Sequence, residues 1–580
     1  MGGKGIRESA GASRCSWWGE CVAEKAVDLE KRREEGGWTG RIYFLVFLAI
    51  VPVYFFAYAF YGYNDADDGY ILAFSWRVFN GEVPYRDFIM VKPPLSAWLH
   101  ALPLYVIPGN DVILFERLFC YTLLLASCLF CSTTITRVFD RVVPRQDPYL
   151  LATTGFVFSA HNFPPMAWQT IDGIFFASAG IAVLAGSKRH WHVYTGLSLL
   201  FLSALCKQSF YLVPPAGILY LYFLNRNLKP LLLAVLWLAV CTLCFLLLLY
   251  RLHALERFFT LTSGSTRLRD LASAGIVRYL RLGYPYLAAL LLLFLLSRKS
   301  PFTGKWDAAR KFSPYLFISF LLIYPMIKFF QGMANDHFHY DQFTSPFFQD
   351  PLAQVLLLLA VILFLLNLRL ERHWLTLWFL VLLSWCTAIS WGYRTPVLCS
   401  TPLLFSFFLF VQKYFQRKDP GQLVIFTLAL GLLTYWLAYQ KPFCNPLRKE
   451  LTYDLAAEFP KLHSIKVGKD TYQKYKEFKT LVGQYGPHFK TLPGMPLSNY
   501  LTNTLSPIPI DWAYNAETNN NNEWLIHALS EKAPFVFMER YPQLITVTAS
   551  EGKFNSSLSH YVRSHWQKID STGYFEVYRK

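Results

Sequence analysis

The sequence predicts an α-helical polytopic membrane protein that carries an extracytoplasmic α/β domain at its C-terminus. The chain has 580 residues, of which 54% are hydrophobic, and its mean hydropathy is +0.28. Long apolar runs recur between residues 42 and 440, and a run of about 20 apolar residues is long enough for a helix to cross a bilayer. Basic residues collect in the short polar gaps between these runs, as they do in cytoplasmic loops.

Charge and cysteine content exclude several other classes of protein. The net charge of +17 does not indicate nucleic-acid binding, because the Lys and Arg residues are explained by membrane topology. The 11 cysteines form neither a disulfide framework nor the spacing of a zinc site. The sequence has no Walker loop, Rossmann glycine fingerprint, HExxH or GxSxG motif. Nucleotide-driven transport is therefore not indicated.

The N-terminal residues 1–41 are polar and predict a cytoplasmic tail. The apolar run that follows is too long for the h-region of a signal peptide, so we expect an uncleaved first span. If each later span crosses the membrane in the direction opposite to the one before it, the chain has about thirteen spans and its C-terminus lies outside. The predicted spans are residues 42–61, 112–136, 149–160, 173–185, 193–205, 210–223, 231–250, 287–296, 315–330, 352–366, 375–389, 397–411 and 424–439.

Two segments depart from this pattern. Residues 94–107 are apolar but short and bounded by proline, which predicts a helix that lies in the membrane interface. Residues 441–580 alternate polar helix-like stretches with short β-branched runs, which predicts a small α/β domain. The expected organisation is thus a tail (1–41), a membrane module (42–440, with its first external loop at 62–111) and an outer domain (441–580).

The most informative stretch is residues 64–99, where acids and a lysine interrupt the apolar chain. Asp65, Asp67 and Asp68 directly follow the first span, where a partly dehydrated carboxylate can act as a general base or hold a cation. The alternative is the solvated start of a loop. Lys92 precedes two prolines and an interfacial segment, so we expect it at the headgroup level, where a cation suits a lipid phosphate.

The motifs of this stretch carry a family resemblance. D-D-G-Y at 67–70, N-G-E-V-P-Y-R-D-F at 80–88 and K-P-P-L at 92–95 resemble the first external loop of GT-C membrane glycosyltransferases. The most similar group by pattern is the aminoarabinose-transferase and Rgt-like group, which is related to protein O-mannosyltransferases. The resemblance implies a GT-C fold and transfer of a sugar from a polyprenyl-phosphate carrier to an acceptor at the outer face.

Matching residue by residue, the resemblance implies that Asp67 is the catalytic carboxylate and that Asp68 is the second acid of the pair. It implies that Lys92 contacts the carrier phosphate. Deprotonation of an acceptor hydroxyl by Asp67, with Lys92 offsetting the charge on the leaving phosphate, gives an in-line displacement that inverts the anomeric centre. Asp65 has no counterpart in the family pattern, and we assign it to the substrate-binding group without a defined role.

Two residues near the outer ends of later spans also match the family. Asp172 matches an acid that binds substrate, and the alternative is a charge favoured by the helix dipole. Lys207 in L-C-K-Q-S-F matches a recurring L-x-K motif and is expected at the donor phosphate, and the alternative is a lysine that snorkels to the interface.

The later external loops supply further candidates. Arginines in the loop 251–284 run against the positive-inside trend, and a second phosphate contact would explain them. We expect that contact from Arg267 or Arg269, with Arg278 and Arg281 as the alternatives. Tyr393 and Arg394 are expected to bind substrate, although they depart from the pattern of Rgt relatives. The D-H-F-H-Y-D segment at 336–341 could bind a divalent cation, but we favour acceptor or loop contacts and expect no required cofactor and no metal site.

The leading prediction is an inverting glycosyltransferase of the bacterial inner (plasma) membrane. Its partners would be a polyprenyl-phosphate sugar donor, a lipid, glycan or protein acceptor of the envelope, and membrane lipids, with no nucleic acid. Two other classes remain open at this stage. A secondary transporter or flippase would place charges near span centres and show an internal repeat, and a non-catalytic envelope assembly protein would keep the fold without the chemistry.

Overall fold

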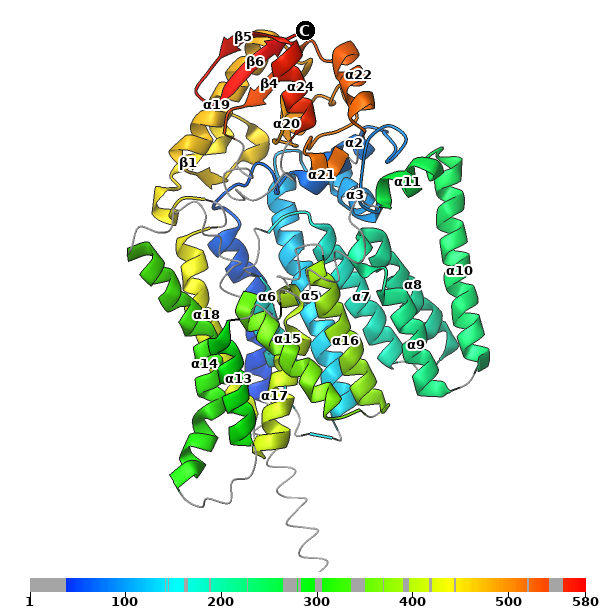
Figure 1. Cartoon of the computed structure of the whole chain (residues 1–580), viewed down its shortest axis with the longest axis vertical. Coiled ribbons are helices and arrows are strands. Elements are labelled where there is room, and N and C mark those ends of the chain that lie inside the picture. Colours follow the sequence, from blue (N-terminus) through cyan, green and yellow to red (C-terminus); the bar gives the residue numbers. More distant parts are fainter. Residues whose placement is uncertain are drawn as a thin grey trace, which may run out of the picture.

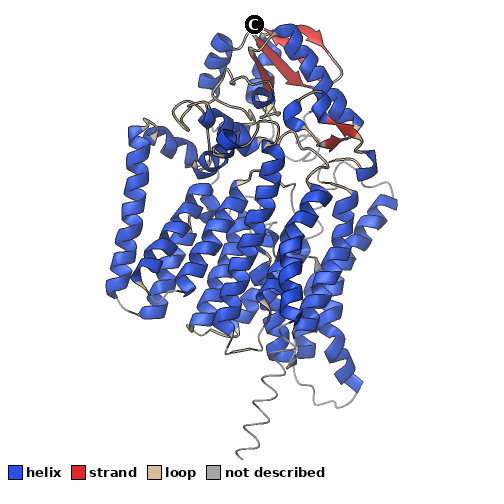
Figure 2. Ribbon diagram, turned by 180° about the vertical axis from the view of Figure 1, so that it is seen from behind, coloured by secondary structure: helices blue, strands red, loops and turns tan. Residues whose placement is uncertain are grey.

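The chain folds into a helical bundle that carries a mixed α/β unit on one end (Figure 1). The computed structural model describes residues 38–140, 142–143, 146–160, 165–186, 189–226, 228–263, 279, 283–297, 305–334, 350–368, 370–389, 396–416, 420–442, 445–518, 521–541 and 556–580. In two opposite views the strands all lie in the end unit, and short helices fill the junction between it and the bundle (Figure 2).

Each predicted span overlaps a helix of the described chain. The bundle consists of the helix Trp38–Tyr58, α5 (Val112–Phe139), α6 (Pro148–Ser159), α7 (Gln169–Gly186), α8 (His190–Cys206), η1 (Gln208–Phe210), α9 (Val213–Asn225), α10 (Leu228–Arg251), α13 (Tyr284–Ser297), α14 (Lys305–Ala334), α15 (Asp350–Leu365), α16 (Arg372–Ala388), η5 (Pro396–Cys399), α17 (Thr401–Phe415) and α18 (Gly421–Gln440). Several boundaries differ from the prediction. Helix α17 begins after η5, with Pro402 in its first turn, and α14 begins at Lys305, before the predicted span at 315–330.

Four helices are long and apolar enough to cross a membrane within the described part of the chain. They are Trp38–Tyr58, α5, α7 and α10, and several of the other apolar helices are shorter. Helix α10 buries little of its surface and exposes many leucines, which is the composition of a lipid-facing helix. The chain is therefore that of an integral membrane protein, and the number and direction of the crossings stay predictions.

The C-terminal unit is built on a four-stranded sheet in the order β3-β4-β6-β5. Strands β3 and β4 are parallel, and the other pairs are antiparallel. The elements are η6 (Arg448–Glu450), β1 (Tyr453–Asp454), η7 (Leu455–Ala457), η8 (Pro460–Leu462), β2 (Lys466–Val467), α19 (Lys469–Tyr485), β3 (Phe489–Leu492), α20 (Ser498–Leu501), α21 (Asn515–Thr518), α22 (Asn522–Lys532), β4 (Phe535–Glu539), α24 (Ser557–His565), β5 (Gln567–Ser571) and β6 (Phe575–Arg579). The predicted α/β character of this region is confirmed.

The loop after the first helix lies between the bundle and the C-terminal unit. It contains α2 (Tyr70–Phe79), α3 (Leu95–Ala101) and α4 (Pro103–Val106), and α11 (Leu255–Thr262) crosses beside it (Figure 1). Its apolar side chains Phe88 and Met90 are fully buried in one cluster with Ile508 and Val536 of the C-terminal unit. The loop is therefore covered by the C-terminal unit and is not a freely solvated segment.

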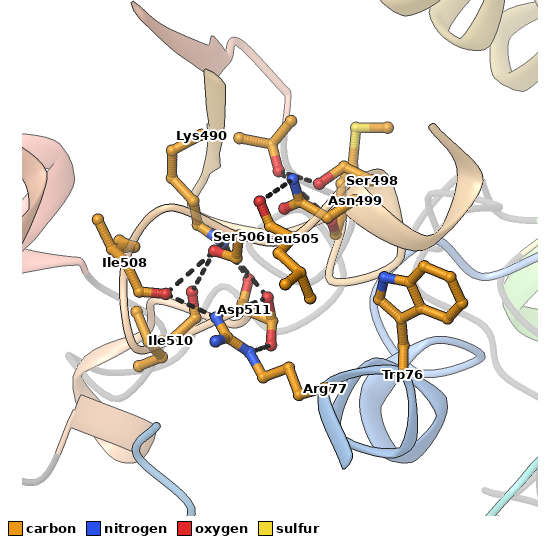
Figure 3. Close-up of polar contacts among 12 residues, drawn as sticks. Trp76, Arg77, Lys490, Ser498, Asn499, Leu505, Ser506, Ile508, Ile510 and Asp511 are labelled. Carbon is orange, nitrogen blue, oxygen red and sulfur yellow. Dashed lines mark hydrogen bonds and ion pairs between the residues drawn. The ribbon is translucent and has the colours of Figure 1, made fainter. Parts of the chain in front are cut away.

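A buried ion pair fastens α2 to the C-terminal unit (Figure 3). The guanidinium of Arg77 donates to both carboxylate oxygens of Asp511, at 2.5 and 3.2 Å, and to the carbonyl of Ile508 at 2.6 Å. Lys490 of β3 lies 3.8 Å from the same aspartate. Removing one partner of such a buried pair leaves an uncompensated charge, so this contact fixes the position of α2.

Candidate functional site

The turn that carries the three acids is organised by Asn64. Its side-chain oxygen accepts hydrogen bonds from the backbone N–H groups of Ala66 (3.0 Å) and Asp67 (3.1 Å). Its side-chain N–H₂ group donates to a carboxylate oxygen of Asp67 at 3.0 Å. An asparagine that bonds the backbone two and three residues on is a common way to hold a tight turn. Asn64 therefore sets both the backbone and the side chain of Asp67.

Asp68 is committed to a structural ion pair. It accepts the N–H of Asn64 at 2.8 Å and the guanidinium of Arg117 at 3.1 Å, and both charged side chains are 2% exposed. Arg117, on α5, also donates to the carbonyls of Ala59 (2.5 Å) and Gly62 (2.9 Å). The arginine thus closes the C-terminal end of the first helix and the start of the turn. This arrangement gives Asp68 a positioning role beside Asp67.

Asp65 pairs with the C-terminal unit. The ammonium of Lys474, on α19, lies 2.5 Å from its carboxylate and 3.6 Å from that of Glu539, at the end of β4. All three side chains are buried. The acid for which the sequence offered no role is therefore a contact between the loop and the C-terminal unit.

Asp67 is the one of the three acids whose side chain is partly exposed. Burial of its surroundings and the neighbouring Asp68 carboxylate raise the pKa of Asp67 to about 7, although the hydrogen bond from Asn64 opposes the shift. A general base works best when its pKa lies near the working pH. Asp67 thus combines access to solvent with a pKa near neutrality.

A second group of charges lies after α2 and α8. The ammonium of Lys92 lies 3.9 Å from the carboxylate of Glu517 on α21, and the hydroxyl of Tyr70 donates to the same carboxylate at 2.7 Å. Lys207, directly after α8, donates to the hydroxyl of Thr170 at 2.7 Å. Burial and the nearby Lys92 ammonium lower the pKa of Lys207 to about 7, with Glu517 opposing. Two ammonium groups that influence each other in this way can together attract an anion.

Tyr70 joins the two groups. Its backbone N–H donates to the carbonyl of Asp67 at 3.2 Å, and its hydroxyl reaches Glu517, which faces Lys92. The candidate base and the candidate anion site therefore lie at the two ends of one residue at the start of α2.

Lys207 is buried in the structure, and its expected contact with the donor phosphate stays a prediction. The residue is 3% exposed, so it does not snorkel to the surface of the described structure. Its ammonium instead lies in the same electrostatic environment as Lys92 and Glu517. The sequence prediction that Lys92 and Lys207 act together is consistent with this geometry.

Asp172 has a different partner from the one expected. It lies in the first turn of α7, where it accepts from the ring of His100 at 3.1 Å, and the other ring nitrogen of His100 lies 2.6 Å from Glu116. All three side chains are buried. This contact ties α3 to α5 and α7, so the structure gives Asp172 a helix-packing role, and a substrate contact stays an untested prediction.

Several predicted site residues lie outside the described part of the chain. These are Arg267, Arg269, Arg278, Arg281, Tyr393, Arg394 and the D-H-F-H-Y-D segment at 336–341. Among the described residues, no group of three or more His, Cys, Asp or Glu side chains is arranged to hold a metal ion. The phosphate, substrate and metal expectations for those loops stay predictions.

The sequence analysis missed four charged residues of the site: Arg117, Lys474, Glu517 and Glu539. Arg117 had a readable signal, because Glu116 and Arg117 interrupt an apolar span, and charges in spans usually mark function or close pairing. Lys474 also had one, because it borders the apolar face formed by Tyr475, Phe478 and Leu481 on α19. The two glutamates have no local pattern that separates them from surface acids.

Comparison with known proteins gives few matches. No family model and no curated protein matches the chain. Two solved structures are similar to it, the crystal structures of ArnT from Cupriavidus metallidurans in the apo state and bound to undecaprenyl phosphate. They share 11% and 12% identity with this chain, have TM-scores of 0.44, and cover 94% and 93% of it and 98% of their own chains.

Proposed function

We propose that this protein is an inverting glycosyltransferase that moves a sugar from a polyprenyl-phosphate donor to a hydroxyl of an envelope glycan, lipid or protein. The reaction would take place at the outer face of a bacterial plasma membrane. The observation that carries the proposal is the pairing of a partly exposed carboxylate, Asp67, with a two-lysine anion site, through the single residue Tyr70.

Asp67 fits the role of general base. Its pKa of about 7 lets it be ionised in a large fraction of molecules at neutral pH and still bind a proton strongly. Asp68 and Asp65 do not fit this role, because each is buried in an ion pair.

Lys92 and Lys207 fit the role of phosphate ligands. Burial and the nearby Lys92 charge both disfavour the protonated form of Lys207. The negative charge of a bound phosphate would offset both effects. Ammonium groups in a buried site also stabilise charge that develops on a leaving phosphate.

The proposed step balances without a cofactor. The acceptor hydroxyl oxygen forms a bond to the anomeric carbon, and its proton passes to Asp67. The bond between the anomeric carbon and the phosphate oxygen breaks with its electron pair on the phosphate, which leaves as polyprenyl phosphate beside the two lysines. One displacement on the face opposite the leaving group inverts the anomeric centre.

The experiment that tests the proposal uses the purified full-length protein in lipid nanodiscs with a panel of polyprenyl-phosphate sugars. We expect release of polyprenyl phosphate from one member of the panel, by hydrolysis or by transfer to an added acceptor. Release must be lost in Asp67→Asn. If no donor is cleaved, and the protein in vesicles instead moves an intact lipid-linked sugar across the bilayer, the protein is a flippase and the proposal is wrong.

A further inference from the structure

Asp67 lies beside a cluster of charges to which the C-terminal unit contributes a cation. From the loop come Asp65 and Asp68, and from α5 comes Arg117. From the C-terminal unit come Lys474 and Glu539, with the hydroxyl of Tyr514 also in this environment. The Arg117 cation pairs with Asp68, and the Lys474 cation pairs with Asp65.

We propose that Lys474 is a positioning residue for the site: its ammonium offsets the negative charge of Asp65, which lies two residues from Asp67 and opposes the ionisation of Asp67. The inference rests on the proposed role of Asp67 as base. It makes the C-terminal unit part of the active site, because Lys474 is 409 residues from Asp65 in the chain.

The geometry supports this electrostatic role over one in which the contact only holds the loop and the C-terminal unit together. The Lys474–Asp65 distance is 2.5 Å, and both side chains are 7% exposed, so solvent does little to screen either charge. The negative charges of Asp68 and Asp65 both raise the pKa of Asp67. The second carboxylate near Lys474, Glu539, is itself buried, which raises its pKa and leaves Asp65 as the main partner of the ammonium.

The inference predicts opposite effects of the two partners. Lys474→Met removes the cation that lies 2.5 Å from Asp65, so the pH at which Asp67 ionises should rise, by up to about one unit. Asp65→Asn leaves Lys474 without its main anion, so the same pH should fall. The double variant Asp65→Asn/Lys474→Met removes one charge of each sign and should restore a value close to that of the wild type. A contact that only holds two parts together would not produce shifts of opposite sign.

The measurement follows the protonation of Asp67 directly. A carbodiimide reacts with protonated carboxyl groups, and mass spectrometry of peptides from the labelled full-length protein locates the modification at Asp67 across a pH series. The exposed Asp454 serves as an internal reference, and Lys476→Met, an exposed lysine on the same helix, is the matched control. The labelling midpoint of Asp454 should be the same in all variants, and the labelling midpoint of Asp67 in Lys476→Met should equal that of the wild type.

The readout is independent of turnover. Opposite shifts for the single variants with restoration in the double variant support the inference, even if no sugar donor is ever cleaved. Unchanged midpoints, or shifts in the same direction for both single variants, overturn it, even if the wild type transfers sugar. Should Lys474→Met not fold, the downward shift in Asp65→Asn and its reversal in the double variant decide the question.

Discussion

The ammonium of Lys92 lies 3.9 Å from the carboxylate of Glu517, a residue that reaches it from the opposite end of the sequence. The other oxygen of this carboxylate accepts the hydroxyl of Tyr70 at 2.7 Å. A carboxylate therefore faces Lys92, one of the two lysines that we assign to the donor phosphate. It competes electrostatically with any anion that binds there.

Removal of this competing charge should tighten binding of the donor lipid. We expect Glu517→Gln, which can still accept from Tyr70, to increase the affinity for polyprenyl phosphate by about tenfold, or about 1.4 kcal/mol. Equilibrium binding of polyprenyl phosphate to the solubilised protein measures it. Glu523→Gln, an exposed glutamate on α22, is the control and should change nothing. An unchanged or weaker affinity in Glu517→Gln would mean that the carboxylate does not face the phosphate.

Loss of either lysine should have the reverse effect. Lys92→Met and Lys207→Met each remove one charge-assisted contact, so each should weaken polyprenyl phosphate binding by about 10- to 100-fold. Lys449→Met, at an exposed lysine of η6, provides the comparison. If either site variant binds the lipid as tightly as the wild type, that lysine is not a phosphate ligand.

The two groups with pKa values of about 7 predict a bell-shaped pH profile. Asp67 must lose its proton to act as base, so the rate rises with pH through its pKa. Lys207 must keep its proton to bind phosphate, so the rate falls as pH rises through its lowered pKa. We expect kcat/KM to peak near pH 7. Because arginine stays charged, Lys207→Arg should lose the alkaline limb and keep the acid limb. If kcat/KM of the wild type does not fall at alkaline pH, Lys207 is not the second group.

Arg117 is expected to be the most important residue for stability in the turn. Arg117→Met leaves the buried Asp68 carboxylate without its cation and removes the arginine donor from two carbonyls, which should cost about 3 to 5 kcal/mol. A lowered unfolding temperature in detergent would show it. Arg86→Met breaks an exposed pair with Asp87 and should cost less than about 1 kcal/mol. Equal effects of the two substitutions would argue against the buried pair.

The sequence predicted the positions of the helices well, because a long apolar run has one stable conformation in a bilayer, a helix. The run at 231–250 became α10 (Leu228–Arg251), and the short run at 94–107 became α3 and α4. It also singled out Asp67 and Lys92 as candidate site residues, because the motifs that contain them are continuous in the chain, and their roles stay predictions. It also named Asp68 as the second acid of the catalytic pair; in the structure this residue forms an ion pair with Arg117, and a catalytic role for it stays a prediction.

The partners of the site could not be read from the sequence, because they come from distant segments. Lys474 is 409 residues from Asp65, and Glu517 is 447 residues from Tyr70. Only the docking of the C-terminal unit onto the loop brings these charges together. The position of Lys474 beside the apolar face of α19 indicates that it lies near the core, but it does not show which carboxylate it meets.

The assignment of Asp67 as base is tested most directly by Asp67→Asn. The amide keeps the size of the side chain and cannot take up a proton, so turnover of the polyprenyl-phosphate sugar should fall by about 100- to 10,000-fold. Binding of polyprenyl phosphate should remain, because the lysines are untouched. Turnover at the wild-type rate by a folded, lipid-binding Asp67→Asn protein would contradict the account.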